Sequence, residues 1–286
     1  MKTLIIPVDF SSCAKNALRF GLRFAQAMDA DIRILNVVPL MVTSPSDPLP
    51  PNPTEVYDPD TIHERLRDFL DRTVEDEPSL AELPALMRVD TMVQAGFVAP
   101  SIVQAAKEDS EAWILLGTEG VHGRLEAVFG STASAVVNKA RNPVLVIPDT
   151  FHWNHPINKL AAAVSHPVKD ENVLRTLNEW AKAFDATMNF VHVVEEEQVL
   201  TTGATANSLS AYDKIPGHVR VQADTLTGHS VEAALRSYCE DEDVDGLVMW
   251  REEHTIMDRL LHGSETKRMV LRSEKPLLIW PPARES

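Results

Sequence analysis

The sequence predicts an α/β protein made of two tandem open five-stranded parallel sheets with helices on both faces. Short, uninterrupted apolar runs that read as buried strands alternate along the 286 residues with amphipathic helical patterns. The second half repeats the order of the first, and Pro143 before the fifth run corresponds to Pro276, an offset of 133 residues. We therefore expect one domain over residues 1–150 and a second over residues 151–286.

The first domain contains five runs with the composition of buried parallel strands. Ser11 or Ser12 is placed to cap the helix after the first run, because serine oxygens accept from free N–H groups at helix N-termini. A proline-rich loop over 39–59 follows the second run, and an acidic amphipathic helix is expected at about 61–75. The five runs are Leu4–Val8, Ile32–Val38, Arg88–Gln94, Trp113–Leu116 and Val144–Ile147.

The second domain contains a counterpart of each of these runs. A helix between its first two strands is predicted by apolar residues on one stripe, among them Leu177 and Trp180. Residues 195–216 are rich in Thr, Ala, Ser and Gly, so the second helix is expected to be shortened or lost. The five runs are Leu160–Val164, Asn189–Val194, Val219–Ala223, Gly246–Trp250 and Pro276–Trp280.

The charge balance and the cysteines exclude several classes of protein. A net charge of −15 argues against a nucleic-acid binder, which needs a basic face to displace counterions. No apolar run approaches the roughly 20 residues that cross a bilayer, so no membrane partner is expected. Cys13 and Cys239 match no metal or redox spacing and suit a reducing cytoplasm.

A glycine-spaced loop joins the fourth apolar run to a helical pattern. Gly117, Gly120 and Gly130 punctuate this loop, and Ser131 begins the helix. Glycines let backbone N–H groups approach a ligand, and the first turn of a helix adds free donors and a partial positive charge, so the stretch suits a phosphate. The same spacing also fits an ordinary surface loop that needs positive φ angles.

Two further positions fall at the same edge of the predicted sheet. Asp9 follows the first strand, and its carboxylate suits either the hydroxyls of a ribose or the cap of the next helix. Val37 lies at the end of the second strand, where its backbone can face an adenine edge or simply continue a core strand.

These motifs resemble the universal stress protein family. The resemblance rests on Pro7-Val-Asp-Phe-Ser11, Asn36-Val-Val38, Gly117-x2-Gly120-x9-Gly130-Ser131 and Asn142-Pro-Val-Leu-Val-Ile147. It implies a fold like that of the adenine-nucleotide alpha hydrolases and a site for ATP, ADP or AMP, with or without Mg²⁺. The residues it implies for the nucleotide are Pro7, Asp9, Val37, Gly117, Gly120, Gly130, Ser131 and Thr132.

The resemblance also implies how domains of this kind pair. Family members similar to this chain pair through their last strands. Val144–Ile147 and Leu277–Trp280 are therefore expected to join the two halves as a pseudo-dimer, and a homodimer of the chain is a further expectation.

The second copy departs from the nucleotide-binding pattern. The offset of 133 residues puts Trp250 at the position of Gly117 and Glu253 at that of Gly120, while Gly263-Ser264 survives. Ser165 takes the place of Asp9. Trp250 would crowd the phosphate path and Glu253 would repel a phosphate, so we expect no family-type ATP binding in this half.

The leading hypothesis from the sequence is a cytoplasmic stress-response protein that uses an adenine nucleotide in its first domain as a regulatory or assembly switch. No residue stands out as a catalytic base or nucleophile and no metal ligands are expected, so at most slow ATP hydrolysis follows. Two alternatives stay open at this point. One is an interaction scaffold that needs no nucleotide, and the other is a different small ligand in the second domain, with Trp250 as a stacking wall.

Overall fold

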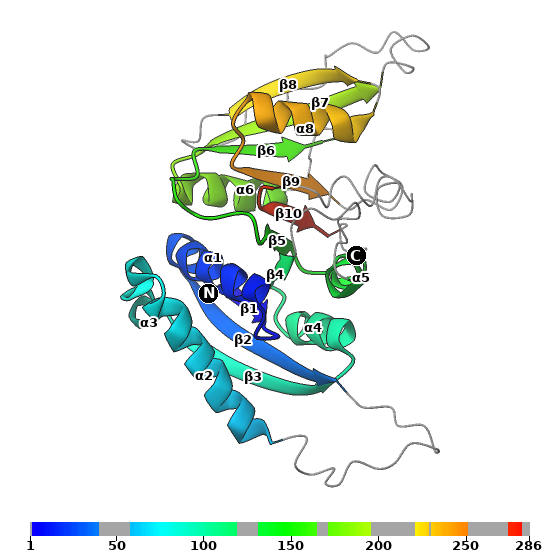
Figure 1. Ribbon diagram of the computed structural model, residues 1–286. Coiled ribbons are helices and arrows are strands. Elements are labelled where there is room, and N and C mark those ends of the chain that lie inside the picture. Colours follow the sequence, from blue (N-terminus) through cyan, green and yellow to red (C-terminus); the bar gives the residue numbers. More distant parts are fainter. Residues whose placement is uncertain are drawn as a thin grey trace, which may run out of the picture. The chain divides into compact units, whose positions relative to one another are not determined.

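The computed structural model describes residues 2–39, 58–118, 131–164, 171–195, 221–228, 230–250 and 274–281 (Figure 1). Its described residues form two compact units, the first up to Val144 and the second from Leu145 onward. The division falls inside the strand that ends the first sequence repeat. Most of the proline-rich loop over 39–59 and nearly all of 195–216 lie outside the described residues.

The first unit alternates strands and helices as the apolar runs predicted. Its two longest helices, α1 and α2, have 17 residues each. The elements, in chain order, are β1 (Lys2–Pro7), α1 (Ser12–Met28), β2 (Ala30–Pro39), α2 (Pro59–Glu75), a 3₁₀ turn (Pro78–Leu80), α3 (Leu83–Leu86), β3 (Val89–Gly96), α4 (Val98–Lys107), β4 (Trp113–Thr118) and α5 (Ser131–Lys139). The next strand, β5 (Val144–Pro148), contains the division between the two units.

The sheet of the first unit is parallel wherever its strand register is defined. β1 lies in the middle of the order β3-β2-β1-β4, and pairs with β2 as far as Pro7 opposite Leu35. On its other side it pairs with β4 through Ile5 opposite Ile114. Because β1 and β2 are covered on both faces, their central residues are almost wholly buried, and this explains why the runs read as uninterrupted apolar stretches.

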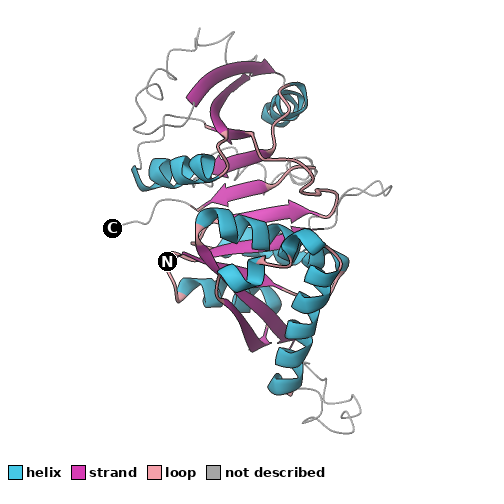
Figure 2. Ribbon diagram, turned by 90° about the vertical axis from the view of Figure 1, so that its left-hand side faces the viewer, coloured by secondary structure: helices cyan, strands magenta, loops and turns pink. Residues whose placement is uncertain are grey.

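Helices cover both faces of this sheet (Figure 2). α1 packs on β1, β2 and β4 and touches α2, whereas α4 packs on the strands and touches α5. Ser11 caps α1 by accepting a hydrogen bond from the N–H of Ala14 at 3.2 Å, so the first of the two expected serines is the cap. Asp58 caps α2, which begins two residues earlier than the sequence predicted, at Pro59.

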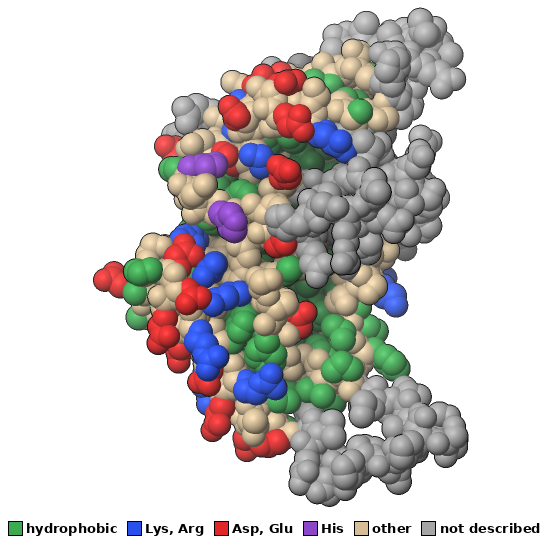
Figure 3. All heavy atoms as spheres, viewed as in Figure 1, with side chains coloured by type: hydrophobic (Ala, Val, Ile, Leu, Met, Phe, Trp, Pro, Cys, Tyr) green, Lys and Arg blue, Asp and Glu red, His purple; other side chains and the backbone are tan. Residues whose placement is uncertain are grey.

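A ladder of ion pairs joins α1 to the end of α2. Lys15, Arg19 and Arg23 lie one turn apart on α1 and meet Asp76 and Glu77 just beyond α2. Basic and acidic side chains therefore interleave over these helices in the space-filling view (Figure 3). The Lys15 ammonium, through its hydrogen bond, holds the pKa of Asp76 below its usual value. The ladder fixes the far end of a helix that buries only Ile62, Leu66 and Thr73.

The second unit repeats the architecture. Its described elements are β6 (Lys159–Ala163), α6 (Glu171–Ala183), β7 (Thr187–Glu195), β8 (Val221–Gly228), α8 (Val231–Asp241), β9 (Gly246–Trp250) and β10 (Leu277–Trp280). The strands follow the order β10-β9-β6-β7-β8 and all pair in parallel. The predicted five-stranded parallel sheet is thus confirmed here, although β8 runs five residues beyond the end that the sequence predicted.

A buried polar chain lies between β7, β8 and α8. The amide nitrogen of Asn189 donates to the Tyr238 hydroxyl at 2.7 Å, and that hydroxyl donates to an oxygen of Asp224 at 2.5 Å. Burial, and then the neighbouring carboxylate, raises the pKa of the Tyr238 phenol above its usual value. The Tyr238 hydroxyl therefore stays protonated and joins the two strands to the helix.

Among the described residues, no helix is long and apolar enough to cross a bilayer.

Candidate functional site

The carboxyl ends of three neighbouring strands form the candidate site of the first unit. β1 lies between β2 and β4, and continuing their registers by two to four residues brings Asp9 level with Val37 and Thr118. Neighbouring strands lie about 4.8 Å apart, so these three positions share one short stretch of the sheet edge. Ligands of open α/β sheets bind at such edges.

The turn after β1 holds Asp9 in place. Asp9 is exposed, and its Oδ1 accepts a hydrogen bond from the N–H of Ser11 at 3.0 Å. The interpretation of Asp9 as the helix cap is wrong, because Ser11 caps α1 and Asp9 instead ties back the cap residue itself. Phe10, between them, has a φ of 66°. This left-handed conformation is energetically unfavourable for any residue that has a side chain. One carboxylate oxygen of Asp9 is thus anchored at the rim of the sheet.

Pro7 and Val37 are both half-buried at the ends of their strands. Pro7 is the last residue of β1, and Val37 continues β2 opposite Gln94 of β3. Asn36, which the sequence analysis gave no role, is buried beside them and donates from Nδ2 to the carbonyl of Val8 at 2.7 Å. An asparagine inside an apolar strand was the signal for this brace between the ends of β1 and β2.

Gly117 has a packing reason that the sequence did not reveal. A Cβ at this position would lie 2.7 Å from the carbonyl carbon of Cys13 and 3.2 Å from the Cβ of Ala17, both on α1. The second copy has Trp250 at the corresponding position, but in the first unit α1 leaves no space for a side chain at Gly117. A role of Gly117 toward a phosphate stays a prediction, and the close approach of α1 to β4 accounts for the residue already.

The helix α5 supplies the remaining described residues of the predicted site. Ser131 is its first residue and is exposed, and Thr132 after it is half-buried. No acidic residue lies in the first turn, so nothing there opposes the partial positive charge of the helix N-terminus. Gly120 and Gly130 lie outside the described residues.

The second unit keeps the brace but changes its chemistry. His192 on β7 holds the position of Asn36, and its Nδ1 lies 2.9 Å from the carbonyl oxygen of Val164, the residue that corresponds to Val8. Trp250 ends β9, and its indole Nε1 is buried with no hydrogen-bond partner in the described part of the chain. Ser165, Glu253, Gly263 and Ser264 lie outside the described residues.

Two features bear on metals and thiols. The described residues contain no group of three or more His, Cys, Asp or Glu side chains that could hold a metal ion. Cys13 and Cys239 form no disulfide among the described residues, and both are half-buried. Burial raises the pKa of the Cys239 thiol to about 11, which makes it a poor nucleophile at neutral pH.

The parallel sheet with helices on both faces defines an α/β protein, and its polar groups gather at the carboxyl edge, where ligands of open α/β sheets bind. The chain belongs to the universal stress protein family, whose model matches residues 1–148.

The relatives agree with this assignment. A universal stress protein of Mycobacterium tuberculosis is 30% identical over 148 residues, which are 51% of this chain and 48% of the relative. The match thus spans about half the length of that relative. A universal stress protein of Synechocystis is 22% identical over 294 aligned positions, covering 97% of this chain and 99% of the relative. Both halves of the chain therefore have a counterpart within one protein.

Solved structures support the fold across the whole chain. A universal stress protein from Archaeoglobus fulgidus superposes with a TM-score of 0.68 at 18% identity and covers 98% of each chain. A putative universal stress protein from Pseudomonas aeruginosa gives a TM-score of 0.57 at 13% identity, with 98% of this chain and 92% of the other covered. The predicted α/β fold, with parallel strands and helices, is confirmed.

Proposed function

We propose that the first unit binds an adenine nucleotide, ATP or its ADP and AMP forms, and that this binding acts as a regulatory or assembly switch in a cytoplasmic stress response. Cys13 and Cys239, which form no disulfide in the described part of the chain, are consistent with a reducing compartment. The second unit does not bind a nucleotide in the same way.

The observation that carries the proposal is the parallel register of β1 with β2 and β4, which, continued beyond its last pairs, brings Asp9 to the level of Val37 and Thr118 at the sheet edge. Asp9 is exposed and directs a carboxylate to that edge, where it can accept from the hydroxyls of a ribose. Val37 is half-buried, so its apolar side chain and its backbone offer one wall for an adenine. A nucleoside needs such an apolar wall beside an acceptor.

The phosphates belong at the start of α5. Ser131 and Thr132 offer hydroxyl groups and the free N–H groups of a first turn that carries no acid. An Mg²⁺ ion in this site would be held chiefly by phosphate oxygens and water, since the described residues lack a ligand cluster.

Isothermal titration with ATP tests the proposal, and the sequence repeat supplies a matched control. Asp9→Ala removes the acceptor, whereas Ser165→Ala changes the corresponding position in the second half. A hydrogen bond to a charged group contributes about 1.5–3 kcal/mol, so Asp9→Ala should weaken binding by about 10- to 100-fold. Ser165→Ala should leave the affinity unchanged. An intact chain that releases no heat with ATP would remove the nucleotide claim.

A second candidate function concerns a different small ligand in the second unit. The indole N–H of Trp250 is buried without an acceptor in the described residues, and a buried unpaired donor is costly. A ligand that offers an acceptor and a flat surface would satisfy both parts of this side chain. Adenosine, which carries no phosphate, is a suitable probe, and quenching of fluorescence in the intact chain that disappears in Trp250→Phe would support the idea. Equal quenching in both proteins would refute it.

We further propose that the two halves pair through Val144–Ile147 and Leu277–Trp280. All five residues of β5 are buried, and strands with free edges need a partner or a cover. A protease site introduced into the linker near His152 allows the chain to be cut after folding. The two fragments should co-elute on gel filtration if the pairing is right, and should separate if it is wrong.

A further inference from the structure

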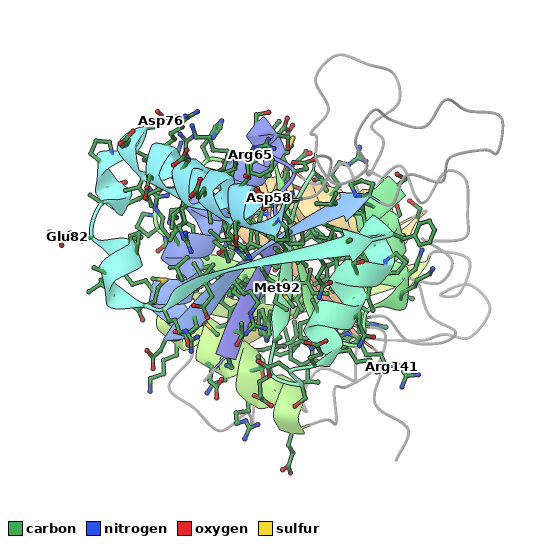
Figure 4. The ribbon with its side chains drawn as sticks, turned by 90° about the horizontal axis from the view of Figure 1, so that it is seen from below. Asp58, Arg65, Asp76, Glu82, Met92 and Arg141 are labelled. Atoms are coloured by element: carbon green, nitrogen blue, oxygen red, sulfur yellow. The ribbon has the colours of Figure 1, made fainter. Side chains whose placement is uncertain are left out.

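The helix α2 touches the turn that carries Asp9. The Phe10 ring packs edge-on against the ring of Phe69, with centroids 5.6 Å apart and planes at 84°. The guanidinium carbon of Arg65 lies 4.5 Å from the centre of the same Phe10 ring. Arg65 and Phe69 are four residues apart, so one face of α2 makes both contacts. Figure 4 shows Arg65 on α2 together with Asp58 and Asp76 at the two ends of the helix.

The contacted residue is the strained one. Phe10 has φ 66°, and no glycine or asparagine is present there to adopt this conformation without cost. The hydrogen bond from the Ser11 N–H to Asp9 Oδ1 spans Phe10. A turn that relaxes at Phe10 therefore loses this bond, and the Asp9 carboxylate loses its anchor. The two ring contacts oppose that relaxation.

The helix itself is lightly held between its ends. Only three of its 17 residues are buried. An open pocket of about 710 Å³ is lined by side chains of α2, β2 and β3, among them Arg33, His63, Arg67, Leu70 and Met92. A hydrogen-bonding contact of 2.7 Å between His63 Nδ1 and Thr91 Oγ1 joins α2 to β3 at this pocket. Segments with few buried contacts open locally at low free energy.

We infer that α2 is a control element for the candidate nucleotide site. Arg65 and Phe69 clamp Phe10 in its left-handed conformation, and the clamped turn presents the Asp9 carboxylate at the sheet edge. Arg65 and Phe69 are positioning residues, since they act through Phe10. This inference rests on the proposed nucleotide site for its consequence, but the clamp exists without any ligand.

The coupling is reciprocal. If docking of α2 favours the Asp9 conformation that binds nucleotide, nucleotide binding must favour docking of α2 by the same factor. A partner or modification that lifted α2 would therefore lower nucleotide affinity without touching the site. The clamp thus gives the proposed switch a mechanical element, within the first unit alone.

The first test uses the nucleotide-free protein. Amide hydrogen exchange at Ser11 reports whether its N–H is bonded to Asp9. A cation–π contact at the surface is equivalent to about a two- to fivefold change in an equilibrium, and an aromatic pair to a similar or larger one. Arg65→Ala should therefore speed exchange at Ser11 about threefold, and Arg65→Ala with Phe69→Leu about tenfold. Arg72→Ala, the same change on an exposed turn of α2, is the control and should leave exchange unaltered.

The second test adds ATP. The two clamp variants should raise the Kd for ATP, at most by these factors, because the apparent Kd varies inversely with the fraction of chains whose turn is closed. Wild-type protein should show slower exchange along α2 when ATP is bound. In a Phe10→Gly background the ring that Arg65 and Phe69 contact is absent, so Arg65→Ala should have no further effect on the Kd for ATP.

The outcomes separate the two proposals. Unchanged Ser11 exchange in Arg65→Ala with Phe69→Leu overturns the clamp, whether or not ATP binds. Faster Ser11 exchange without any ATP binding in the wild type supports the clamp and removes the proposed nucleotide function. An Arg72→Ala effect as large as that of Arg65→Ala would mean general loosening of α2, and would also overturn the clamp.

Discussion

Gly117→Ala is expected to destabilise the first unit by a predictable amount. The added Cβ would lie 2.7 Å from the Cys13 carbonyl carbon, where ordinary contacts need 3.4–4 Å. The obstructing atoms belong to the backbone of α1, so the first turn of this helix must move by about 0.7 Å or more. Overpacking of this kind costs about 1–3 kcal/mol. Alanine also lowers the conformational entropy of the unfolded chain, which offsets about 0.4–1 kcal/mol of this loss. A net loss of about 1–2 kcal/mol follows.

Gly21→Ala is the matched control for this change. Its Cβ would lie 2.5 Å from Ile6 Cδ1, the far end of a side chain that can rotate, and Gly21 is inside α1 where alanine gains about 1 kcal/mol of helix propensity. The two effects offset, and we expect a change within about 1 kcal/mol of zero. The same chemical change thus separates a backbone obstruction from a side-chain one.

Urea unfolding followed by hydrogen exchange measures both variants. Peptides that cover β1 and β4 report the opening of the first unit separately from the second. Gly117→Ala should lower the protection of these strands by about 5- to 30-fold, and Gly21→Ala should leave it nearly unchanged. If Gly117→Ala is no more destabilising than Gly21→Ala, the close approach of α1 to β4 is not what requires the glycine.

Further predictions concern polar contacts away from the site. Tyr238→Phe leaves the buried Asn189 amide and Asp224 without their hydroxyl partner and should cost about 1–3 kcal/mol in urea unfolding. Because the pKa of Tyr238 is raised in the folded protein, the unfolded chain releases the phenol proton near pH 10 while the folded chain keeps it. The free energy of unfolding of the wild type should therefore fall above pH 10 more steeply than that of Tyr238→Phe. Parallel pH profiles of the two proteins would contradict this. Glu77→Gln removes two ion pairs with α1 and should lower the free energy of unfolding by about 0.2–1 kcal/mol at low salt. In 1 M NaCl the variant and the wild type should be almost equally stable. A loss of stability that does not depend on salt would show that charge is not the cause.

The strands and most helices could be predicted because their signals are local. In runs such as Leu4–Val8 the strand is buried on both faces, so consecutive residues are apolar and the strand can be recognised from the run alone. The helix expected at about 61–75 was predictable from its amphipathic spacing, whereas its start at Pro59, with Asp58 as the cap, was not predicted. The clear difference in the second unit is β8, whose later residues, Asp224 to Gly228, include polar side chains that tertiary contacts accommodate.

The features that could not be predicted from the sequence depend on contacts between residues far apart in the chain. Gly117 looked like a loop glycine because the backbone of Cys13, about a hundred residues away in sequence, is what crowds it. The conformation of Phe10 could not be predicted, since a left-handed φ in phenylalanine has no sequence signature. Its partners on α2 arrive from beyond the proline-rich loop. A pattern that reads neighbours along the chain could not bring these residues together.

The number of nucleotides bound per chain tests the central claim most directly. Equilibrium dialysis of the intact chain against ATP counts the sites without relying on heat or fluorescence. We predict one equivalent per chain, strongly reduced in Asp9→Ala and unchanged in Ser165→Ala. Zero equivalents, two equivalents, or a single equivalent that Asp9→Ala leaves intact would contradict a nucleotide site confined to the first unit.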